Sequence, residues 1–456
     1  MILKKAYLYS KNSSNLLKNS IIYIILVFVA SSCSKESVYQ NTYNKTLQIE
    51  TIKTFGGSKN DAFLSVKSTF DGGYIAVGHS QSSDFDIKEK TNDSYDYWVL
   101  KFDNSNNLVW NKTFGGSNDD RARDIIELND GSFIISGFSR SNDVDVTNNE
   151  GNYDFWVVKI DENGNLIWEK NFGFSGSDQA FVIKQVSDNS ILLGGSLDVT
   201  ASGGQGNSKV ANKHAGGDYW LIKIDINGNK LWSKYYGGLF TDTLLDIAET
   251  DNGNYILTGF SDSADTNISN NLGTYDYWVV KVDNSGTLLW EKNFGGSEID
   301  EAYAISKTPE DAFLIVGNSR SLDKDISKNN GSSDIWVIKI DVDGKLLWEK
   351  NFGGSSFEGA KKIIPFSNGG FLIVGSSRSA DTDVTENKGN KDVWVIKINN
   401  EGTLEWQKSI GGSELEEANS IVEFQNGAII VGESWSSDQE INVNKGFSDA
   451  LLIKLK

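Results

Sequence analysis

The sequence has very few of the residues on which common catalytic centres and disulfide-stabilised folds depend. Among 456 residues there are one cysteine, two histidines (His79 and His214) and two prolines. A single cysteine excludes an internal disulfide framework. The motifs GxSxG, HExxH and GxxxxGK[ST] are also absent from the sequence, so the enzyme classes that they mark find no support. Basic residues number 43 against 62 acidic ones, and the net charge of −19 argues against a nucleic-acid partner.

A corner with two glycines recurs along the chain. It reads NFGGS at 293–297 and 351–355 and TFGGS at 54–58 and 113–117. Measured at the residue before the first glycine, it falls at Phe55, Phe114, Phe172, Tyr236, Phe294, Phe352 and Ile410. The steps of 58 to 64 residues are the signature of a repeat architecture.

Each repeat contains four strand-like runs and no helix-length periodicity. In the repeat that starts at Phe294, the runs lie around 301–307, 312–318, 334–340 and 345–351, and all are rich in β-branched and aromatic residues. Turn dipeptides separate the first run from the second and the third from the fourth, as at Asp130-Gly131, Asn163-Gly164 and Asn426-Gly427. These dipeptides favour tight hairpins, so each repeat predicts one four-stranded antiparallel sheet.

Seven such sheets in tandem predict an all-β fold, a seven-bladed β-propeller with the first run of each repeat lining the central channel. Residues 46–58 match only the fourth run, and residues 449–456 match only the third. We therefore expect the N-terminal strand to complete the last blade and close the ring. A ring of six or eight blades would require one of the seven repeats to be miscounted. The corner glycines permit the sharp crossover between blades.

The first 45 residues differ from the repeats. Four lysines, the apolar stretch 21–30 and the small residues before Cys33 form the layout of an export signal. The run VASSC (29–33) resembles a bacterial lipobox, which implies that Cys33 carries a lipid anchor; the alternative is a plain cleaved signal with a chance cysteine. We predict a lipoprotein signal peptide at 1–32, a flexible lipid tether at 33–45 and the propeller at 46–456. The expected location is the cell envelope, in the outer membrane, on its periplasmic or its surface side.

The repeat also carries a family resemblance, over about residues 46–456. The stretch VIKIDVDGKLLWEKNFGG (337–354) is similar to the tryptophan-docking repeat of quinoprotein-like propellers, and the whole unit resembles the repeat of uncharacterised propeller lipoproteins of Bacteroidota. The resemblance implies a propeller in the envelope and says little about activity. Quinoprotein dehydrogenases need a vicinal disulfide or an equivalent aromatic sandwich and calcium ligands, which one cysteine does not match. The propeller lipoprotein of the outer-membrane assembly machinery is an alternative resemblance, although that family generally has eight blades.

Two sets of acids recur in the repeat. One set follows each corner by six residues: Asp61, Asp120, Asp178, Asp242, Asp300, Glu358 and Glu416. These residues form either an acidic ring at one channel mouth or caps for neighbouring backbone. The other set consists of paired aspartates in the long loop between the second and third runs: Asp143 and Asp145, Asp323 and Asp325, Asp381 and Asp383. Alternate oxygen ligands suit weak calcium binding, but Asx-turns use the same residues.

Function is expected where the repeats differ. Twelve of the 13 tryptophans occupy two repeated positions and are expected in the core. The remaining one, Trp435, occupies a variable position after the second run, where other repeats have Arg140, Arg320 and Arg378. His214 lies in the longer loop of the third repeat. These five residues form the candidate binding face.

We therefore expect a non-enzymatic, monomeric lipoprotein that binds a protein or glycan of the cell envelope through its loop-rich face, with no cofactor except possible calcium. The alternative is a carboxylate- and calcium-dependent hydrolase or lyase acting on an envelope or extracellular polymer.

The lipid anchor can be tested directly. Cys33→Ser should move the protein from the membrane fraction to the soluble fraction, because the lipobox interpretation leaves no other anchor. Fractionation followed by immunoblotting measures this, and a variant that stays with the membrane would contradict the interpretation.

Overall fold

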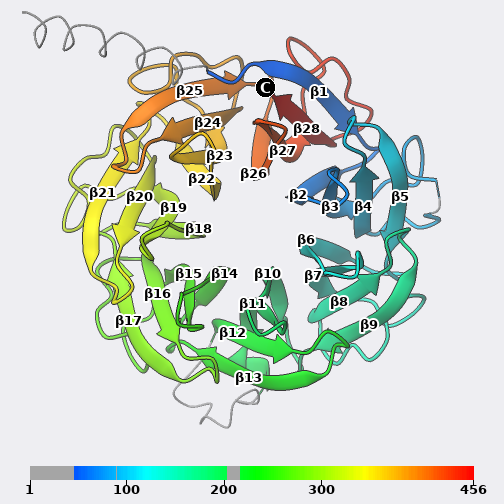
Figure 1. The fold of residues 1–456 in the computed structure, drawn as a ribbon, viewed down its shortest axis with the longest axis horizontal. Helices are drawn as coiled ribbons and strands as arrows, with labels where there is room; N and C mark the ends of the chain where they lie inside the picture. The colour runs from blue at the N-terminus through cyan, green and yellow to red at the C-terminus, as the bar shows by residue number, and fades with distance from the viewer. Residues whose placement is uncertain (1–45, 89, 203–215) are drawn as a thin grey trace, which may run out of the picture. The chain divides into compact units, whose positions relative to one another are not determined.

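The strands of each repeat pair in sequence order, and the resulting sheets stand around a central channel (Figure 1). The structure is a computed structural model that describes residues 46–88, 90–202 and 216–456. Leu47–Lys456 form one unit, which holds seven four-stranded antiparallel sheets. The prediction of a seven-bladed β-propeller is confirmed. Within these described ranges, no helix is long and apolar enough to cross a membrane.

Six blades are continuous in sequence, and their strands run from the channel outward. Blade 1 consists of β2 (Asp61–Ser68), β3 (Tyr74–Ser80), β4 (Asp96–Phe102) and β5 (Leu108–Phe114). Blade 2 consists of β6 (Asp120–Glu127), β7 (Phe133–Ser139), β8 (Asp154–Ile160) and β9 (Leu166–Phe172). Blade 3 consists of β10 (Gln179–Gln185), β11 (Ile191–Asp198), β12 (Gly217–Ile224) and β13 (Lys230–Tyr236), with the short helix α2 (Val199–Ser202) after β11.

The second half of the ring repeats this order. Blade 4 consists of β14 (Asp242–Glu249), β15 (Tyr255–Ser261), β16 (Asp276–Val282) and β17 (Leu288–Phe294). Blade 5 consists of β18 (Asp300–Lys307), β19 (Phe313–Ser319), β20 (Asp334–Ile340) and β21 (Leu346–Phe352). Blade 6 consists of β22 (Glu358–Pro365), β23 (Phe371–Ser377), β24 (Asp392–Ile398) and β25 (Leu404–Ile410).

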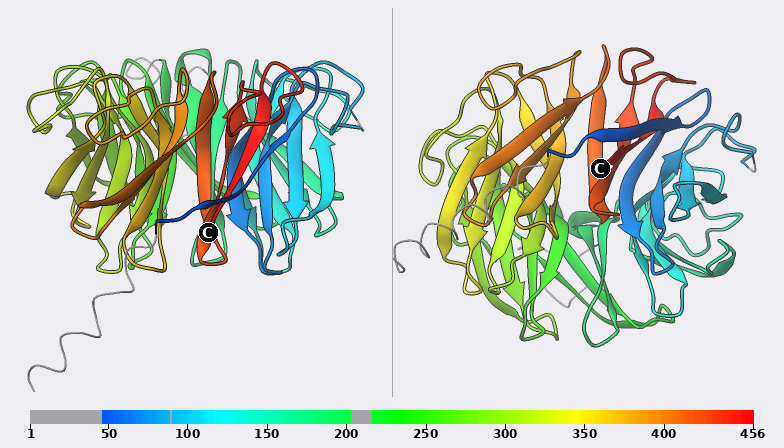
Figure 2. Two further views of the ribbon diagram at one scale, coloured as in Figure 1. Left: turned by 90° about the horizontal axis from the view of Figure 1, so that it is seen from above. Right: turned by 45° about the horizontal axis from the view of Figure 1, so that its top comes forward.

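Blade 7 joins the two ends of the propeller. Its sheet order is β26 (Glu416–Phe424), β27 (Gly427–Ser434), β28 (Asp449–Leu455) and finally β1 (Ile49–Phe55). β1 pairs antiparallel with β28, with Ile52 opposite Ile453, and runs along the outer edge of the ring (Figure 2). The prediction that the N-terminal strand closes the ring is confirmed.

The core lies between neighbouring blades. The tryptophans of the third strands are fully buried, as the sequence predicts. At the junction of blades 4 and 5, the rings of Tyr277 and Trp336 pack with centroids 4.6 Å apart. The hydroxyl of Tyr277 also donates to the carbonyl of Trp336 at 3.0 Å. Each blade thus buries one face of its sheet against the next, so no blade has a core of its own.

The tryptophans of the fourth strands are half-buried and cover the following blade. Trp110 of β5 donates from Nε1 to the carbonyl of Glu162, in the turn between β8 and β9. A Cβ at Gly164 in the same turn would lie 3.2 Å from the Trp110 ring, and Gly164 has a φ of 81°. Glycine therefore serves two purposes there, left-handed backbone and close approach of the ring.

One hairpin differs from its prediction. Asn426-Gly427 was expected to form the turn, but Gln425 and Asn426 form it, with φ of 51° and 63°. Gly427 already belongs to β27 and pairs with Phe424. The turn is shifted by one residue because asparagine, like glycine, tolerates the left-handed region.

The ring is divided into two faces by its loops. The loop-rich face carries the long loops between the second and third strands together with the glycine corners. The opposite face carries the short hairpins that contain Gly131 and Gly164. The loop-rich face also carries the longer loop of blade 3, which sets that repeat apart from the others.

Ring closure can be tested by shortening the chain. A protein that starts at residue 56 should melt at least about 5 °C below one that starts at residue 46, because it loses β1 and exposes the edge of β28. Both chains lack residues 1–45, so the difference reports β1 alone. Equal melting temperatures by circular dichroism would show that the closure is not needed for stability.

Candidate functional site

Each glycine corner is held by carboxylates from two blades. At the junction of blades 4 and 5, the N–H of Gly296 donates to Oδ2 of Asp300 at 2.7 Å, and the hydroxyl of Ser321 donates to the same oxygen at 2.8 Å. A Cβ on Gly296 would lie 2.3 Å from Cβ of Ser321, and a Cβ on Gly295 would lie 2.2 Å from Oδ1 of Asp276. Only glycine fits at both positions.

The acids that follow the corners occupy this same position in all seven blades. Each is fully buried and accepts a hydrogen bond from the backbone N–H four residues earlier, at 2.7 or 2.8 Å. The set is Asp61, Asp120, Asp178, Asp242, Asp300, Glu358 and Glu416. They cap backbone and do not form an acidic ring open to the channel, because their oxygens face the corner and are removed from solvent.

The paired aspartates of the long loops bind the same corners. Oδ1 of Asp323 accepts from the N–H of Ser297 at 2.8 Å, and Oδ2 of Asp325 accepts from the N–H of Gly295 at 3.2 Å. The equivalent residues Asp143, Asp145, Asp381 and Asp383 make the same bonds. Along the described part of the chain, no group of three or more His, Cys, Asp or Glu is placed to hold a metal ion. Backbone capping is the role that these hydrogen bonds show for the aspartates.

A further aspartate approaches each corner from the start of a third strand. Asp276 is fully buried beside Asp300 of the next blade. Burial, together with the charge of Asp300, raises the pKa of Asp276 to about 7. Burial likewise raises the pKa of the equivalent residues to about 6 or 7: Asp96, Asp154, Asp334, Asp392 and Asp449. Two acids at one dry junction favour sharing a proton over carrying two charges.

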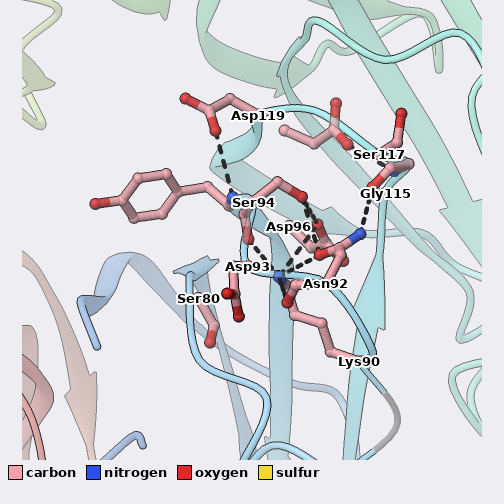
Figure 3. Close-up of polar contacts among 12 residues, drawn as sticks. Ser80, Lys90, Asn92, Asp93, Ser94, Asp96, Gly115, Ser117 and Asp119 are labelled. Atoms are coloured by element: carbon pink, nitrogen blue, oxygen red, sulfur yellow. Dashed lines mark hydrogen bonds and ion pairs between the residues drawn. The ribbon is translucent and has the colours of Figure 1, made fainter. Parts of the chain in front are cut away.

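Blades 1 and 7 each place a lysine 3.7 Å from this aspartate, Lys90 beside Asp96 and Lys445 beside Asp449. Figure 3 shows the lysine of blade 1. Nζ of Lys90 lies 3.7 Å from Oδ1 of Asp96 and donates to the carbonyl of Asn92 at 2.8 Å and to that of Ser94. Burial lowers the pKa of Lys90. The amide of Asn92 ties this loop to the corner, donating to the carbonyl of Gly116 at 2.7 Å. The ammonium thus fixes a loop, and it is not free to bind a ligand.

The three predicted face arginines are exposed. Arg140 lies over the ring of Tyr153 at 6.0 Å, and Arg320 lies over the ring of Phe357 at 5.9 Å. Among the residues that the structure describes, none of Arg140, Arg320 and Arg378 forms an ion pair. The aspartates of the same loops instead accept hydrogen bonds from the N–H groups of the glycine corners.

Trp435 lies in the equivalent position of blade 7. Its backbone N–H donates to the carbonyl of Leu415 at 2.9 Å, and its side chain is half-buried at the mouth of the channel. The other predicted positions, His214 and the lipidation site Cys33, lie outside the described residues.

The inner strands present different chemistry to the channel in each blade. On β6 the residues at alternate positions are Arg121 and Arg123, and on β18 they are Glu301 and Tyr303. The equivalent pairs in the other blades are Ala62 and Leu64, Gln179 and Phe181, Thr243 and Leu245, Gly359 and Lys361, and Glu417 and Asn419. The channel is therefore where the sevenfold symmetry is broken most strongly.

A layer of ion pairs crosses the channel. Lys362 of blade 6 reaches Asp246 of blade 4 at 2.7 Å, across a blade that separates the two. Lys67 contacts Asp124 at 3.1 Å, and Asp124 also accepts from the hydroxyl of Ser65 at 2.7 Å. Asp124 directly follows the channel-facing Arg123 on β6, so this layer forms a floor beneath the loop-rich mouth.

A cavity of about 450 Å³ lies at this mouth, between blades 1, 2, 6 and 7. Its volume is in the range of small-molecule binding sites. The lining combines cations, acids and aromatic rings and includes Tyr95, Arg121, Arg123, Lys361, Glu433 and Trp435.

The environment of the cavity shifts the pKa of several lining groups. Burial, followed by the charges of Arg123 and Arg121, lowers the pKa of His79 well below its ordinary value, so this imidazole is neutral. Burial lowers the pKa of Lys361 to about 8 and that of Arg123 to about 10. Burial raises the pKa of Glu433 to about 7. With a pKa of about 10, Arg123 keeps its charge at neutral pH.

Of the predicted site residues, the structure places Trp435 in this cavity and the arginines on the surrounding face. The channel residues Arg121, Arg123 and Lys361 were missed. A signal for them exists in the sequence, because the first and third positions after each corner acid vary in charge, whereas the second position is always apolar.

Comparison with known proteins found distant similarities. No family model matches the chain. The Regulatory protein FlaEY of Caulobacter vibrioides is 24% identical over 241 residues, which are 49% of this chain and 24% of that protein, so the match spans about a quarter of its length. Similar solved structures include the Pan2 WD40 domain of Neurospora crassa (9% identity, TM-score 0.46, 86% of this chain and 89% of that chain). A europium-containing methanol dehydrogenase is also similar (9% identity, TM-score 0.40, 90% and 93% of the two chains).

The buried acid pairs predict a pH dependence of stability. The native pKa values of the third-strand aspartates, about 6 or 7, lie above the unfolded value near 4, so the native state binds more protons and its stabilisation is lost as pH rises through 6 to 7. Lowering the pH from 8 to 5 should therefore raise the free energy of unfolding by about 2 kcal/mol or more. Urea unfolding at pH 5, 6.5 and 8 measures this, and Asp276→Asn should show a shallower slope. Stability that is flat or falls towards pH 5 would contradict the assignment.

Proposed function

We propose that this chain is a non-enzymatic binding protein of the cell envelope, lipid-anchored at Cys33, which captures a protein or glycan partner on the loop-rich face of its propeller. The observation that carries this proposal is the cavity at the channel mouth. It has a floor of ion pairs, it opens on the face where the repeats differ, and its lining includes Trp435.

The surroundings of the cavity support a binding role. Three arginines are exposed on the same face without ion-pair partners among the described residues, and half-buried Trp435 is next to the opening. Exposed arginine and tryptophan side chains are the ones that most often carry binding energy at protein surfaces. A rigid ring holds such side chains in place at little entropic cost when a partner binds.

The burial of the corner carboxylates also favours a binding role over catalysis. The alternative of a hydrolase or lyase needed acids at the channel mouth, such as Asp120 and Asp300. Both are fully buried and accept hydrogen bonds from the N–H groups of Gly116 and Gly296 at 2.7 Å. The acids that do line the cavity are Glu417, which forms an ion pair with Lys391, and Glu433.

Substitution of Trp435 tests the proposal. Trp435→Ala should weaken capture of envelope partners by about 2 kcal/mol or more, because a tryptophan at an interface usually anchors it. Affinity capture from envelope extract, followed by titration of the captured partner, measures the effect. The matched control is Phe70→Ala, since Phe70 is 71% exposed in a hairpin on the opposite face. Equal loss in both variants, or none in Trp435→Ala, would contradict the proposed binding face.

A further inference from the structure

The guanidinium of Arg123 lines the cavity without an ion-pair partner among the described residues. It faces the channel from β6, half-buried between the rings of Phe138 and Phe181, at 5.2 and 5.5 Å. Within the described ranges it forms no ion pair, and its Nε has no hydrogen-bond acceptor. A charge removed from water is normally compensated by an opposite charge. Arg123 is therefore a cation without an ion-pair partner among the described residues, and Glu433 of the same cavity acts on it only through its charge at longer range.

Other cations converge on the same space. Arg121 is two residues earlier on β6, with its guanidinium 4.0 Å from the centre of the Tyr95 ring. Lys361 enters from blade 6, with its ammonium 3.6 Å from the centre of the Tyr303 ring. Arg121 and Lys361 each lie over the face of an aromatic ring, so some of their N–H groups point away from that ring. Asp119 is close to Arg121, but at 3.5 Å the contact is long for a charged hydrogen bond.

The acids of the cavity do not neutralise Arg123. Glu417 is bound by the ammonium of Lys391. Burial raises the pKa of Glu433 to about 7, so a large share of this side chain is protonated near neutral pH. A protonated or engaged acid can still accept or donate a hydrogen bond. The cavity therefore offers one strong site for an anion and several sites for neutral hydroxyl groups, among them the amide of Asn419.

We propose that this cavity binds a sugar carboxylate, a uronate residue, with Arg123 and Arg121 holding the carboxylate and Trp435 or Tyr95 contacting the sugar ring. The fork of an arginine fits the two oxygens of a carboxylate, and an aromatic side chain beside polar groups suits the apolar face of a pyranose. The inference rests on the proposed function and names the chemistry of the glycan that this face takes.

Charge also limits the kind of anion. A phosphate with two negative charges would be repelled more strongly than a single carboxylate by Glu417, which forms an ion pair with Lys391. The hydroxyl groups of a sugar ring can instead use Glu417 and Glu433 as hydrogen-bond partners. The chain as a whole carries a net charge of −19, which disfavours a long polyanion over the surface. The ligand is thus a free uronate or the end of a glycan chain.

Calorimetric titration with three probes tests the inference: D-glucuronate, D-glucose as its neutral counterpart, and inorganic phosphate. The intact protein should bind glucuronate with a dissociation constant of about 1 mM or tighter, and bind glucose and phosphate at least about tenfold more weakly. Arg123→Gln should weaken glucuronate binding by about tenfold or more, since it removes a charged hydrogen bond.

The control is Lys184→Ala, which removes another channel cation, from β10 near the ion-pair floor, that does not line the cavity. It should leave glucuronate binding unchanged. If Arg123→Gln fails to fold, as judged by its melting temperature, Arg121→Gln serves in its place. Absence of glucuronate binding, equal binding of phosphate, or equal loss in Lys184→Ala would overturn the inference.

The result also separates this inference from the proposed function. If Trp435→Ala abolishes partner capture while glucuronate does not bind, the binding face stands and the uronate assignment falls. If glucuronate binds through Arg123 while capture is indifferent to Trp435, the ligand assignment stands and the partner-binding face falls.

Discussion

The propeller depends on one repeated contact, the backbone N–H of a glycine corner bound by a buried carboxylate of the next blade. At the junction of blades 4 and 5 this is the bond from Gly296 to Asp300. The strands of each sheet satisfy their own hydrogen bonds, but the crossover between sheets leaves backbone groups that no ladder can pair. The acid, the serine after the second strand and the loop aspartates satisfy those groups. The same residues therefore explain the glycines, the acids and the length of the loops.

Much of this architecture could be predicted because the same sequence pattern occurs in seven repeats. The spacing of the corners gave the number of blades, and the unmatched runs at residues 46–58 and 449–456 gave the closure through β1 and β28. The exact turn in blade 7 could not be predicted, since Gln425-Asn426 and Asn426-Gly427 are both compatible with a tight hairpin. The burial of the corner acids could not be predicted either, because it depends on how closely two neighbouring blades approach each other.

The site was harder to predict for a related reason. Repetition marks structural residues, and a binding site is built from the residues that do not repeat. Trp435 was recognised because it stands outside the tryptophan pattern. Arg123 was not recognised, because its importance comes from the residues of blades 1, 6 and 7 that line the same cavity. Those of blades 6 and 7 are more than 200 positions away in the sequence. Only the ring brings them together.

The ion pair between Lys362 and Asp246 bears on how the chain folds. Repeat proteins usually contact only their sequence neighbours, so their units can form one after another. This contact joins residues 116 positions apart, in blades that do not touch through their sheets. It can form only after the intervening blade is in place and the circle has begun to close. Together with β1 on β28, it makes the last stages of assembly depend on one another, so we expect the ring to unfold as a whole and not blade by blade.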